Sequence, residues 1–193
     1  MDLIFASNNA HKLEEIRAVV SDNIDIVSLN EIGFTTELPE TSGTIPGNAL
    51  QKAETLYKAT RRNCFADDSG LEVFALDNRP GVDTAHYAGA ERNAEANNNK
   101  LLKELEGVTD RSARFITVIS LIIDGKAHEF TGEIKGRIAL QKEGTGGFGY
   151  DPLFIPEGFD NSFAALPQEI KNEISHRARA VLALNDWLEK NYL

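Results

Sequence analysis

The sequence predicts an α/β protein in which helices cover the faces of a mixed β-sheet. Short apolar runs typical of buried strands alternate with segments whose apolar residues recur at helical spacing. Two longer runs, 114–123 and 129–138, flank Asp124-Gly125, a dipeptide that favours a tight hairpin turn. The sheet must therefore contain at least one antiparallel pair. A chain of 193 residues suits one domain spanning residues 1–193, with room for two lobes.

The remaining elements follow from the two side-chain periodicities of strands and helices. Shorter apolar runs predict strands at residues 2–6, 24–28 and 64–67, the last of which ends in two acids. Apolar stripes at helical spacing predict helices at residues 11–20, 48–60, 91–105 and 175–190. The helix at 91–105 is weakened by three consecutive poor helix formers, Asn97, Asn98 and Asn99.

The two arms of the hairpin are expected to occupy different places in the sheet. The arm at 114–123 is apolar on both faces, which indicates a central strand. The arm at 129–138 alternates in polarity, as a half-exposed strand does. Its apolar face is expected to carry Phe130, Ile134 and Ile138. Its polar face is expected to carry Glu129, Glu133, Lys135 and Arg137.

The charge of the chain restricts the partners that it can bind. The 30 acidic residues outnumber the 20 Lys and Arg residues, which leaves a formal net charge of −10. This balance argues against a nucleic-acid polymer as partner, because the phosphate backbone rewards a basic face. A small anionic substrate remains compatible if metal ions or a few local Lys and Arg side chains overcome the repulsion.

The chain has no feature typical of an exported or membrane-bound protein. Residues 1–6 lack the basic region and long apolar stretch of a signal peptide. The most apolar segment, 115–123, is far too short to cross a bilayer. Cys64 is the only cysteine, so the chain cannot form an internal disulfide. We therefore expect a cytoplasmic protein with no membrane partner.

The first candidate site lies between the strand at 2–6 and the following helix. Its residues are Ser7, Asn8, Asn9, Ala10, His11 and Lys12. Unpaired N–H groups and a partial positive charge at the start of a helix attract phosphate, and Lys12 adds a full charge. The alternative is that Ser7 or Asn9 only caps the helix and that Lys12 lies in solvent.

The second candidate site is the acidic run Asp67-Asp68-Ser69-Gly70, which follows a predicted strand. Two adjacent acids point to opposite faces if the strand continues, so a turn would have to redirect one of them. Carboxylates gathered in a cleft need a cation, and Mg²⁺ often joins one or two of them to substrate phosphates. Glu40 is a further possible ligand. The alternative is an acidic turn with local backbone hydrogen bonds.

The third candidate site is the Gly-rich loop 144–152, which contains a formal G-x-G-x-x-G pattern. A dinucleotide-binding turn is excluded because the pattern opens no helix and Pro152 follows at once. Phe148 and Tyr150 lie among the glycines, an arrangement that could present an aromatic ring to a base. The alternative is that both rings fill the core.

The fourth candidate site is Lys171 to Arg177, at the entrance to the last helix. Ser175 can cap that helix, which places His176 and Arg177 in its first turn, where a cation opposes the helix dipole. Such a placement suggests a functional reason, for example donation to a base carbonyl or a phosphate. The alternative is a solvated basic turn. Elsewhere, Asn48 and Lys52 share one helix face, where they could line a site or face solvent. The sequence alone favours solvent exposure for both.

The order and spacing of these motifs resemble a known family. The shared segments are Ala6 to Lys12, Glu40-Thr41, Asn48-Ala49 with Lys52-Ala53, Ala66 to Val73, Pro80 to Val82, Tyr87 to Gly89, Gly144 to Pro152 and Ile174 to Arg177. Together they resemble the inosine/xanthosine triphosphate pyrophosphatase family, whose members remove non-canonical purine nucleotides. The resemblance runs from residue 4 to about residue 188, nearly the whole chain.

The resemblance implies an elongated mixed β-sheet flanked by helices, two lobes around a central substrate cleft, and a homodimer. It implies Mg²⁺-dependent hydrolysis of ITP, dITP or XTP to the monophosphate and pyrophosphate. Carried over by motif, the segment from Ser7 to Lys12 holds the phosphates, and Glu40 and Asp68 serve the metal. Asp68 is also the proton acceptor, and Ser69 contacts the substrate. The nucleotide and base pocket would consist of Phe148, Gly149, Tyr150, Asp151, Lys171, His176 and Arg177.

Two departures from the family pattern are visible. Many members have Thr-Gly-Asn where this chain has Ser7-Asn8-Asn9, and many have Glu where this chain has Gly47. Asn tolerates left-handed backbone, so the turn can survive the first change, whereas the second removes one possible acid near the metal. Two other functions stay open at this stage. One is a pyrophosphatase for modified pyrimidine or guanosine nucleotides, and the other is a nucleotide-binding regulator without turnover.

Overall fold

The computed structural model describes all residues from 1 to 193. Its elements in chain order are β1 (Asp2–Phe5), α1 (Ala10–Arg17), β2 (Asp25–Ser28), α2 (Ile45–Thr60), β3 (Cys64–Val73), η1 (Phe74–Leu76), β4 (Arg79–Pro80), η2 (Gly81–His86), α3 (Ala94–Glu104), β5 (Ser112–Ile123), β6 (Lys126–Ile138), β7 (Phe154–Pro156), α4 (Gln168–Ile174) and α5 (His176–Asn191). None of its helices is both long and apolar enough to cross a membrane.

The strands form one mixed sheet in the order β2-β1-β3-β5-β6-β7, and β4 pairs with β3 beside this path. β1 runs parallel to β2 and to β3, whereas β4 and β7 pair antiparallel with their neighbours. β5 and β6 are consecutive neighbours joined by Asp124 and Gly125, both of which have positive φ. The predictions of a mixed sheet, of this hairpin and of a central position for its first arm are confirmed.

Most predicted elements form, but their bounds differ in two informative places. α2 begins at Ile45 rather than 48, because Thr44 caps it by accepting a hydrogen bond from Gly47 N and Pro46 fits its first turn. The strand predicted to end at the acids was wrong, since β3 continues through Asp67 and Asp68 to Val73. Each of these acids has a Lys side chain nearby, so a turn is not needed to separate their charges.

The chain divides into two compact units, each assembled from separate segments. The first unit comprises Met1–Asp68, Thr117–Gly132 and His176–Leu193. The second comprises Ser69–Ile116 and Glu133–Ser175. β3, β5 and β6 each contribute residues to both units.

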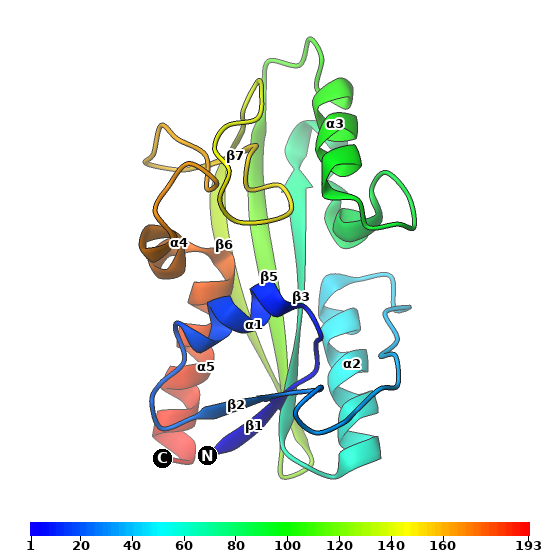
Figure 1. The fold of residues 1–193 in the computed structure, drawn as a ribbon, viewed down its shortest axis with the longest axis vertical. Helices are drawn as coiled ribbons and strands as arrows, with labels where there is room; N and C mark the ends of the chain where they lie inside the picture. Colours follow the sequence, from blue (N-terminus) through cyan, green and yellow to red (C-terminus); the bar gives the residue numbers. More distant parts are fainter. The chain divides into compact units, whose positions relative to one another are not determined.

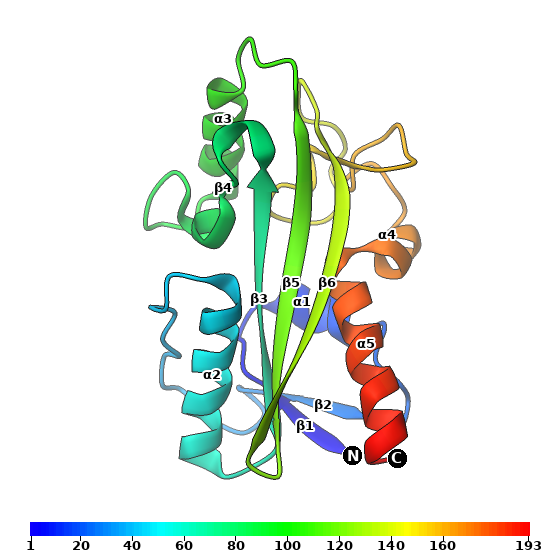
Figure 2. The same cartoon turned by 180° about the vertical axis from the view of Figure 1, so that it is seen from behind.

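The first unit has an apolar layer on each face of its strands. Leu3, Phe5 and Phe65 point into one layer, which also holds apolar residues of α1 and α5, and the two phenyl rings stack 4.9 Å apart. Cys64 and Ala66 point into the other layer, against α2. α1 crosses in front of β3 and β5 in Figure 1 and lies behind them in the reverse view of Figure 2. Alternate residues of β3 therefore face different helices.

The start of α5 packs closely on β6 within the first unit. A Cβ atom built at Gly132 would lie 2.1 Å from the carbonyl oxygen of His176 and 2.4 Å from Ala180 N. Only glycine allows this approach, because any side chain would collide with helix backbone. The first turn of α5 is thus held directly against the sheet.

The second unit has a single core, in which α3 packs on the strands through Leu101 and Leu105. Phe154 is central to it, with ring centroids 4.6 Å from Phe115 and 5.4 Å from Phe163. Figure 2 shows α3 beside the end of β3 that belongs to this unit. The core supports the Gly-rich loop, whose last residues lead into β7.

Candidate active site

The turn between β1 and α1, which the sequence predicts as a phosphate cradle, is closed by local hydrogen bonds. Asn9 caps α1, and its side chain accepts a hydrogen bond of 3.2 Å from Lys12 N. Ser7 Oγ accepts a bond of 3.1 Å from Asn9 N, which tightens the turn. Asn8, Asn9 and Ala10 are exposed, so the first N–H groups of the helix are accessible to an oxyanion.

The alternation of β3 separates the two adjacent acids. Asp67 follows Phe65 on the face covered by α1 and α5, whereas Asp68 follows Ala66 on the face covered by α2. Their carboxylates therefore meet different cations. Because each carboxylate has its own lysine nearby, both acids can stay in β3, and no turn is needed to separate their charges.

Asp67 is the centre of a buried ionic network. Its carboxylate accepts a hydrogen bond of 2.9 Å from Lys12 Nζ and one of 3.2 Å from Arg177 Nε. Arg177 also pairs with Glu15 of α1. Asp67 has no exposed surface and Arg177 is only 1% exposed. The network thus joins β3, α1 and α5 and fixes Lys12 beside the cradle.

The charges in this network set the protonation of its members. Burial opposes ionisation of Asp67, but the nearby Lys12 and Arg177 charges outweigh it and hold the pKa of this carboxyl well below its usual range. Burial lowers the pKa of the Lys12 ammonium, which Asp67 partly offsets. Asp67 is therefore an ionised structural partner and is poorly suited to accept a proton.

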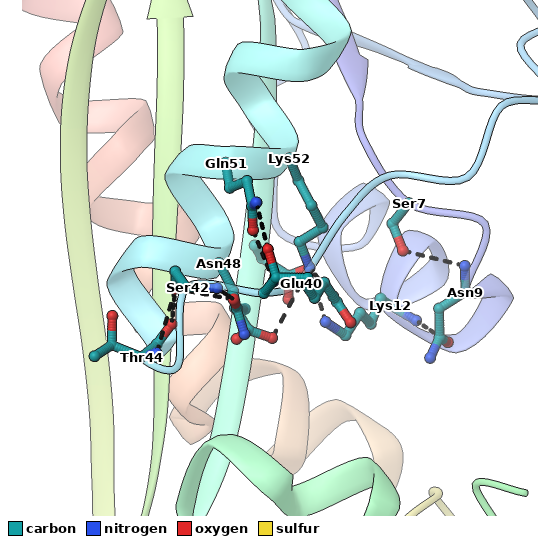
Figure 3. Close-up of polar contacts among 12 residues, drawn as sticks. Ser7, Asn9, Lys12, Glu40, Ser42, Thr44, Asn48, Gln51 and Lys52 are labelled. Carbon is teal, nitrogen blue, oxygen red and sulfur yellow. Dashed lines mark hydrogen bonds and ion pairs between the residues drawn. The ribbon is translucent and has the colours of Figure 1, made fainter. Parts of the chain in front are cut away.

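Glu40 and Asp68 share a different cation, Lys52 of α2. Lys52 Nζ lies 2.5 Å from Glu40 Oε1 and 3.8 Å from Asp68 Oδ1. Figure 3 shows Lys52 extending from the helix toward Glu40. The Lys52 side chain is 7% exposed, whereas those of Glu40 and Asp68 are 33% and 13% exposed. The two carboxylates are thus the more accessible members of this cluster.

Asp68 differs from its neighbour in its affinity for a proton. Burial raises the pKa of its carboxyl, Lys52 and Lys12 oppose the rise, and the nearby Glu40 and Asp67 charges add to it. An accessible carboxylate whose pKa is raised is better matched to accepting a proton than one locked in an ion pair. The geometry therefore favours Asp68 over Asp67 as a base.

The first turns of α2 hold the segment that carries Glu40. Gln51 accepts a hydrogen bond of 2.8 Å from Thr41 N and donates one of 2.8 Å to Thr41 Oγ1. Asn48 Oδ1 accepts bonds from Ser42 N and Ser42 Oγ, at 3.1 and 2.9 Å. These contacts, drawn in Figure 3, place Glu40 over Lys52.

The Gly-rich loop of the second unit is organised around a buried ion pair. Asp151 Oδ2 accepts a hydrogen bond of 2.6 Å from Lys171 Nζ and one of 2.8 Å from Phe148 N. Lys171 Nζ also lies 4.8 Å from the centroid of the Phe148 ring. Asp151 and Lys171 are almost fully buried. They position the loop backbone rather than present their charges to solvent.

The two aromatic residues of the loop have different environments. Tyr150 is 2% exposed, belongs to the core of the second unit and donates a hydrogen bond of 2.8 Å to the carbonyl oxygen of Thr84. For Tyr150 the core-filling alternative is confirmed. Phe148 is only half-buried and remains a candidate for stacking on a base.

The structure places the residues of the fourth candidate site in two positions. α5 begins at His176, so His176 and Arg177 lie in its first turn, as predicted. Both are buried, which contradicts the solvated basic turn considered as the alternative. Ser175 has extended backbone between α4 and α5. Of the sequence-predicted residues, the first unit brings together Lys12, Glu40, Asp68 and Arg177, and the second brings together Phe148, Asp151 and Lys171.

Comparison with known proteins assigns the chain and its fold to one family. A model of the Ham1 family matches residues 3–187. This chain belongs to the Ham1 family. Among solved structures, the Ham1 protein of Staphylococcus aureus has a TM-score of 0.90 and 39% sequence identity, with 98% of this chain and 99% of that chain covered. The predicted α/β fold with a mixed sheet and flanking helices is confirmed.

Curated relatives within the Ham1 family carry a functional name. A protein of Flavobacterium johnsoniae named dITP/XTP pyrophosphatase is 52% identical over 188 residues, which cover 97% of this chain and 98% of the relative. One of Porphyromonas gingivalis with the same name is 55% identical over 187 residues, which cover 96% of each chain. The suspected family resemblance is therefore confirmed over almost the whole chain.

The carboxylates of this candidate site offer few ligands to a metal ion. No group of three or more His, Cys, Asp or Glu side chains gathers in a way that would enclose a metal. Glu40 and Asp68 nevertheless share the Lys52 ammonium, so together they already attract a cation. Mg²⁺ commonly takes only one or two carboxylates and completes its shell with water and substrate phosphates. These hard oxygen donors fit such an open site, and Glu40 and Asp68 would hold the ion.

Lys52 and Asn48 belong to this candidate site, although the sequence alone favoured solvent exposure for both. That preference was wrong, since Lys52 is 6% and Asn48 is 4% exposed. The available signal was their position on the apolar face of α2, between Ala49, Ala53 and Leu56. Buried polar side chains on such a face need hydrogen-bond partners, which Glu40 and Ser42 provide.

The departure at Gly47 has a local structural reason. A Cβ atom at this position would lie 2.4 Å from Ser42 Oγ and 2.7 Å from Thr44 Oγ1. Ser42 in turn bonds Asn48 and the carbonyl oxygen of Thr44. A side chain at position 47 would therefore displace the turn that leads to Glu40. The lack of a side chain at Gly47 therefore leaves the space that Ser42 occupies in this turn.

Proposed function

We propose that this protein is a Mg²⁺-dependent nucleoside triphosphate pyrophosphatase that removes non-canonical purine nucleotides. Its substrates would be ITP, dITP and XTP, and its products the monophosphate and pyrophosphate. The observation that carries the proposal is the cluster of Glu40, Asp68 and Lys52 in the same unit as the Lys12 cradle. Relatives with the name dITP/XTP pyrophosphatase over nearly the full length of the chain support the substrate class.

In the proposed reaction, water attacks the α-phosphorus, and the anhydride bond between the α- and β-phosphates breaks to release pyrophosphate. Asp68 accepts the proton that the attacking water loses. Its raised pKa and its partial exposure suit this role. Asp67 does not compete for the proton, because Lys12 and Arg177 keep it ionised.

Charge on the pyrophosphate leaving group would be stabilised at the β1–α1 turn. Lys12 supplies a full positive charge, and the exposed N–H groups at the start of α1 supply partial charges. When bound, Mg²⁺ would supply the further positive charge that phosphate oxygens need in a protein with a net charge of −10. Glu40 and Asp68 would hold this ion, and Ser7, Asn8, Asn9, Ala10 and His11 would line the phosphate site.

Recognition of the purine is assigned to the remaining candidate residues. Phe148 would stack on the base, and Ser69, Gly149, His176 and Arg177 would contact the nucleotide. The buried Tyr150, Asp151 and Lys171 would hold the loop that carries Phe148. Hypoxanthine and xanthine carry an oxygen at position 6, where adenine has an amino group. Buried donors that pair with this oxygen would be left unpaired by adenine, which can discriminate up to about 10⁴-fold.

We also propose that residues 1–193 act as one domain, that the protein is cytoplasmic and that it forms a homodimer. The homodimer rests on the family resemblance, the single domain on the chain length, and the location on the single cysteine and the lack of a long apolar segment. Light scattering after gel filtration tests the dimer, and cell fractionation tests the location.

Release of pyrophosphate from ITP, XTP, ATP and GTP, with Mg²⁺ and with excess EDTA, tests the proposed function. We expect fast, metal-dependent release from ITP and XTP only. Equal rates with all four nucleotides would retain the phosphate chemistry and refute base selection. Binding of ITP without release would instead indicate a nucleotide-binding regulator.

A further inference from the structure

The three consecutive asparagines of α3 have distinct environments. Asn99 is exposed, whereas Asn97 and Asn98 are buried at 4% and 3% exposure. Asn is a poor residue for a helix interior, and a buried Asn must also find hydrogen-bond partners. Asn97 finds them in the 84–88 segment, where it accepts from Ala88 N at 2.7 Å and donates to Ala85 O at 3.0 Å.

Asn98 reaches from α3 to the Gly-rich loop. Its Nδ2 donates one hydrogen bond of 2.7 Å to Ala94 O in the preceding helical turn and one of 2.8 Å to Gly149 O. The two carbonyl acceptors define the orientation of the amide, because a rotated amide would bring its oxygen against them. Asn98 is therefore a direct tether between a regular helix and this loop.

The other end of the Asn98 amide is unused. Asn98 Oδ1 is buried and has no hydrogen-bond partner in the protein. A buried acceptor without a donor destabilises the fold, and a Leu of similar size would avoid that cost. The polar side chain is thus unfavourable for packing alone. Its donation to Gly149 O is the interaction that a Leu could not replace.

Gly149 is the point of the loop where a tether has most effect. It has φ +62 and lies between Phe148, the candidate stacking ring, and Tyr150, which is anchored in the core. Phe148 N donates a hydrogen bond to Asp151 Oδ2, which is a second restraint on this part of the loop. Without the tether, the glycine could change its dihedral angles at little steric cost and carry Phe148 with it.

We propose that Asn98 is a positioning residue that holds the Gly-rich loop, and with it Phe148, in the conformation that receives the base. The proposal rests on the proposed function for its effect on substrate. In the proposed reaction Asn98 touches no reacting atom and acts through Gly149. The loss of one such hydrogen bond is expected to change loop opening and base affinity about threefold to tenfold.

The test compares Asn98→Asp and Asn98→Leu with the exposed control Asn99→Ala. Asp preserves the shape but replaces the donor with an oxygen, and Leu removes both polar ends while filling the same space. Hydrogen exchange of residues 144–151, thermal stability, and kcat and KM for ITP are measured on each full-length protein. We expect faster exchange in the loop alone and a higher KM at nearly unchanged kcat for both Asn98 variants, with no change for Asn99→Ala.

The Leu variant separates positioning from packing. It removes the unpaired acceptor but also leaves Gly149 O without its donor, so its thermal stability should stay close to that of the wild type while its loop exchanges faster. Wild-type exchange and KM in a folded Asn98→Leu or Asn98→Asp protein would overturn the inference. Hydrogen exchange decides the inference without any turnover, so an inactive wild type would refute only the proposed function.

Discussion

Asp67 and Asp68 are consecutive residues of β3, yet their carboxylates meet different lysines on opposite faces of the sheet. Asp67 Oδ1 lies 2.9 Å from Lys12 Nζ, and Asp68 Oδ1 lies 3.8 Å from Lys52 Nζ. The first pair is buried and part of an ionic network, whereas the second includes the more accessible Asp68. This difference predicts opposite consequences for the same substitution at the two positions.

Asp68→Asn should abolish most turnover while leaving the fold intact. The variant keeps the shape of the side chain but cannot accept a proton, which should lower kcat by about 10²–10⁴-fold. Because burial raises the pKa of Asp68, ionised Asp68 lowers the stability of the folded state as pH rises, and a neutral Asn removes this effect. Pyrophosphate release from ITP and thermal melting at pH 7 check both expectations. Near-normal turnover in a folded variant would exclude Asp68 as the proton acceptor.

Asp67→Asn should instead destabilise the protein, by about 3–5 kcal/mol at pH 7, since it leaves Arg177 and Lys12 short of a buried partner. The pKa of Asp67 is lowered in the folded state, so its contribution is complete above the unfolded value of about 3.9 and is lost as pH falls below it. The difference between wild type and variant in urea unfolding should therefore shrink in acid. The exposed Asp186→Asn on α5 is the control and should show no difference. A variant as stable as the wild type at pH 7 would contradict the network.

The fold was largely predictable because its elements depend on local periodicity. The apolar runs at 114–123 and 129–138 and the Asp124-Gly125 turn are each contained within a few residues, and the structure has them as expected. The end of β3 was not predictable in this way. Whether two acids can remain in a strand depends on Lys12 and Lys52, which are distant in sequence.

The candidate site was predictable only as a set of separate motifs. The turn at Asn9 and the start of α5 at His176 carry local signals, and both form as expected. No local sequence signal indicates which residues will partner the buried polar side chains. Lys52 was expected in solvent because its partner at 2.5 Å, Glu40, lies in an irregular segment whose path the sequence does not predict. Which loop Asn98 contacts likewise depends on tertiary packing.

Gly47→Ala should destabilise the protein, although replacing Gly by Ala in a helix ordinarily stabilises it by up to about 1 kcal/mol. The new Cβ would lie 2.4 Å from Ser42 Oγ and 2.7 Å from Ser42 Cβ, and such overpacking costs about 1–3 kcal/mol. Removal of the Ser42 side chain should relieve most of this cost. In the Ser42→Gly background, Gly47→Ala should destabilise the protein less in chemical unfolding, because only the contact with Thr44 Oγ1 at 2.7 Å remains. A stabilising effect in the wild-type background would refute the collision.

Cys64 should resist thiol reagents in the folded protein. Its Sγ is buried in the layer beneath α2 and lies 3.5 Å from Ala53 O. Burial raises the pKa of the thiol to about 12, so the reactive thiolate is scarce at pH 7–9. Labelling with iodoacetamide should be slow in buffer and fast in urea, and its rate should report global unfolding. Rapid labelling of the native protein would show that this layer opens locally.

Arg177→Ala should reduce the preference for ITP over ATP if the guanidinium contributes to base recognition. The same change removes the partner of Asp67 and Glu15, so a fall in total activity would also follow from lost stability. The ratio of kcat/KM for the two nucleotides avoids this ambiguity, because the concentration of folded enzyme cancels in it. Glu15→Gln is the matched control, since it disturbs the same network but leaves the guanidinium in place. A ratio that falls in Arg177→Ala and not in Glu15→Gln assigns Arg177 to base recognition. An unchanged ratio in both variants would exclude Arg177 from base recognition. Its role would then be to hold Asp67 and the first turn of α5.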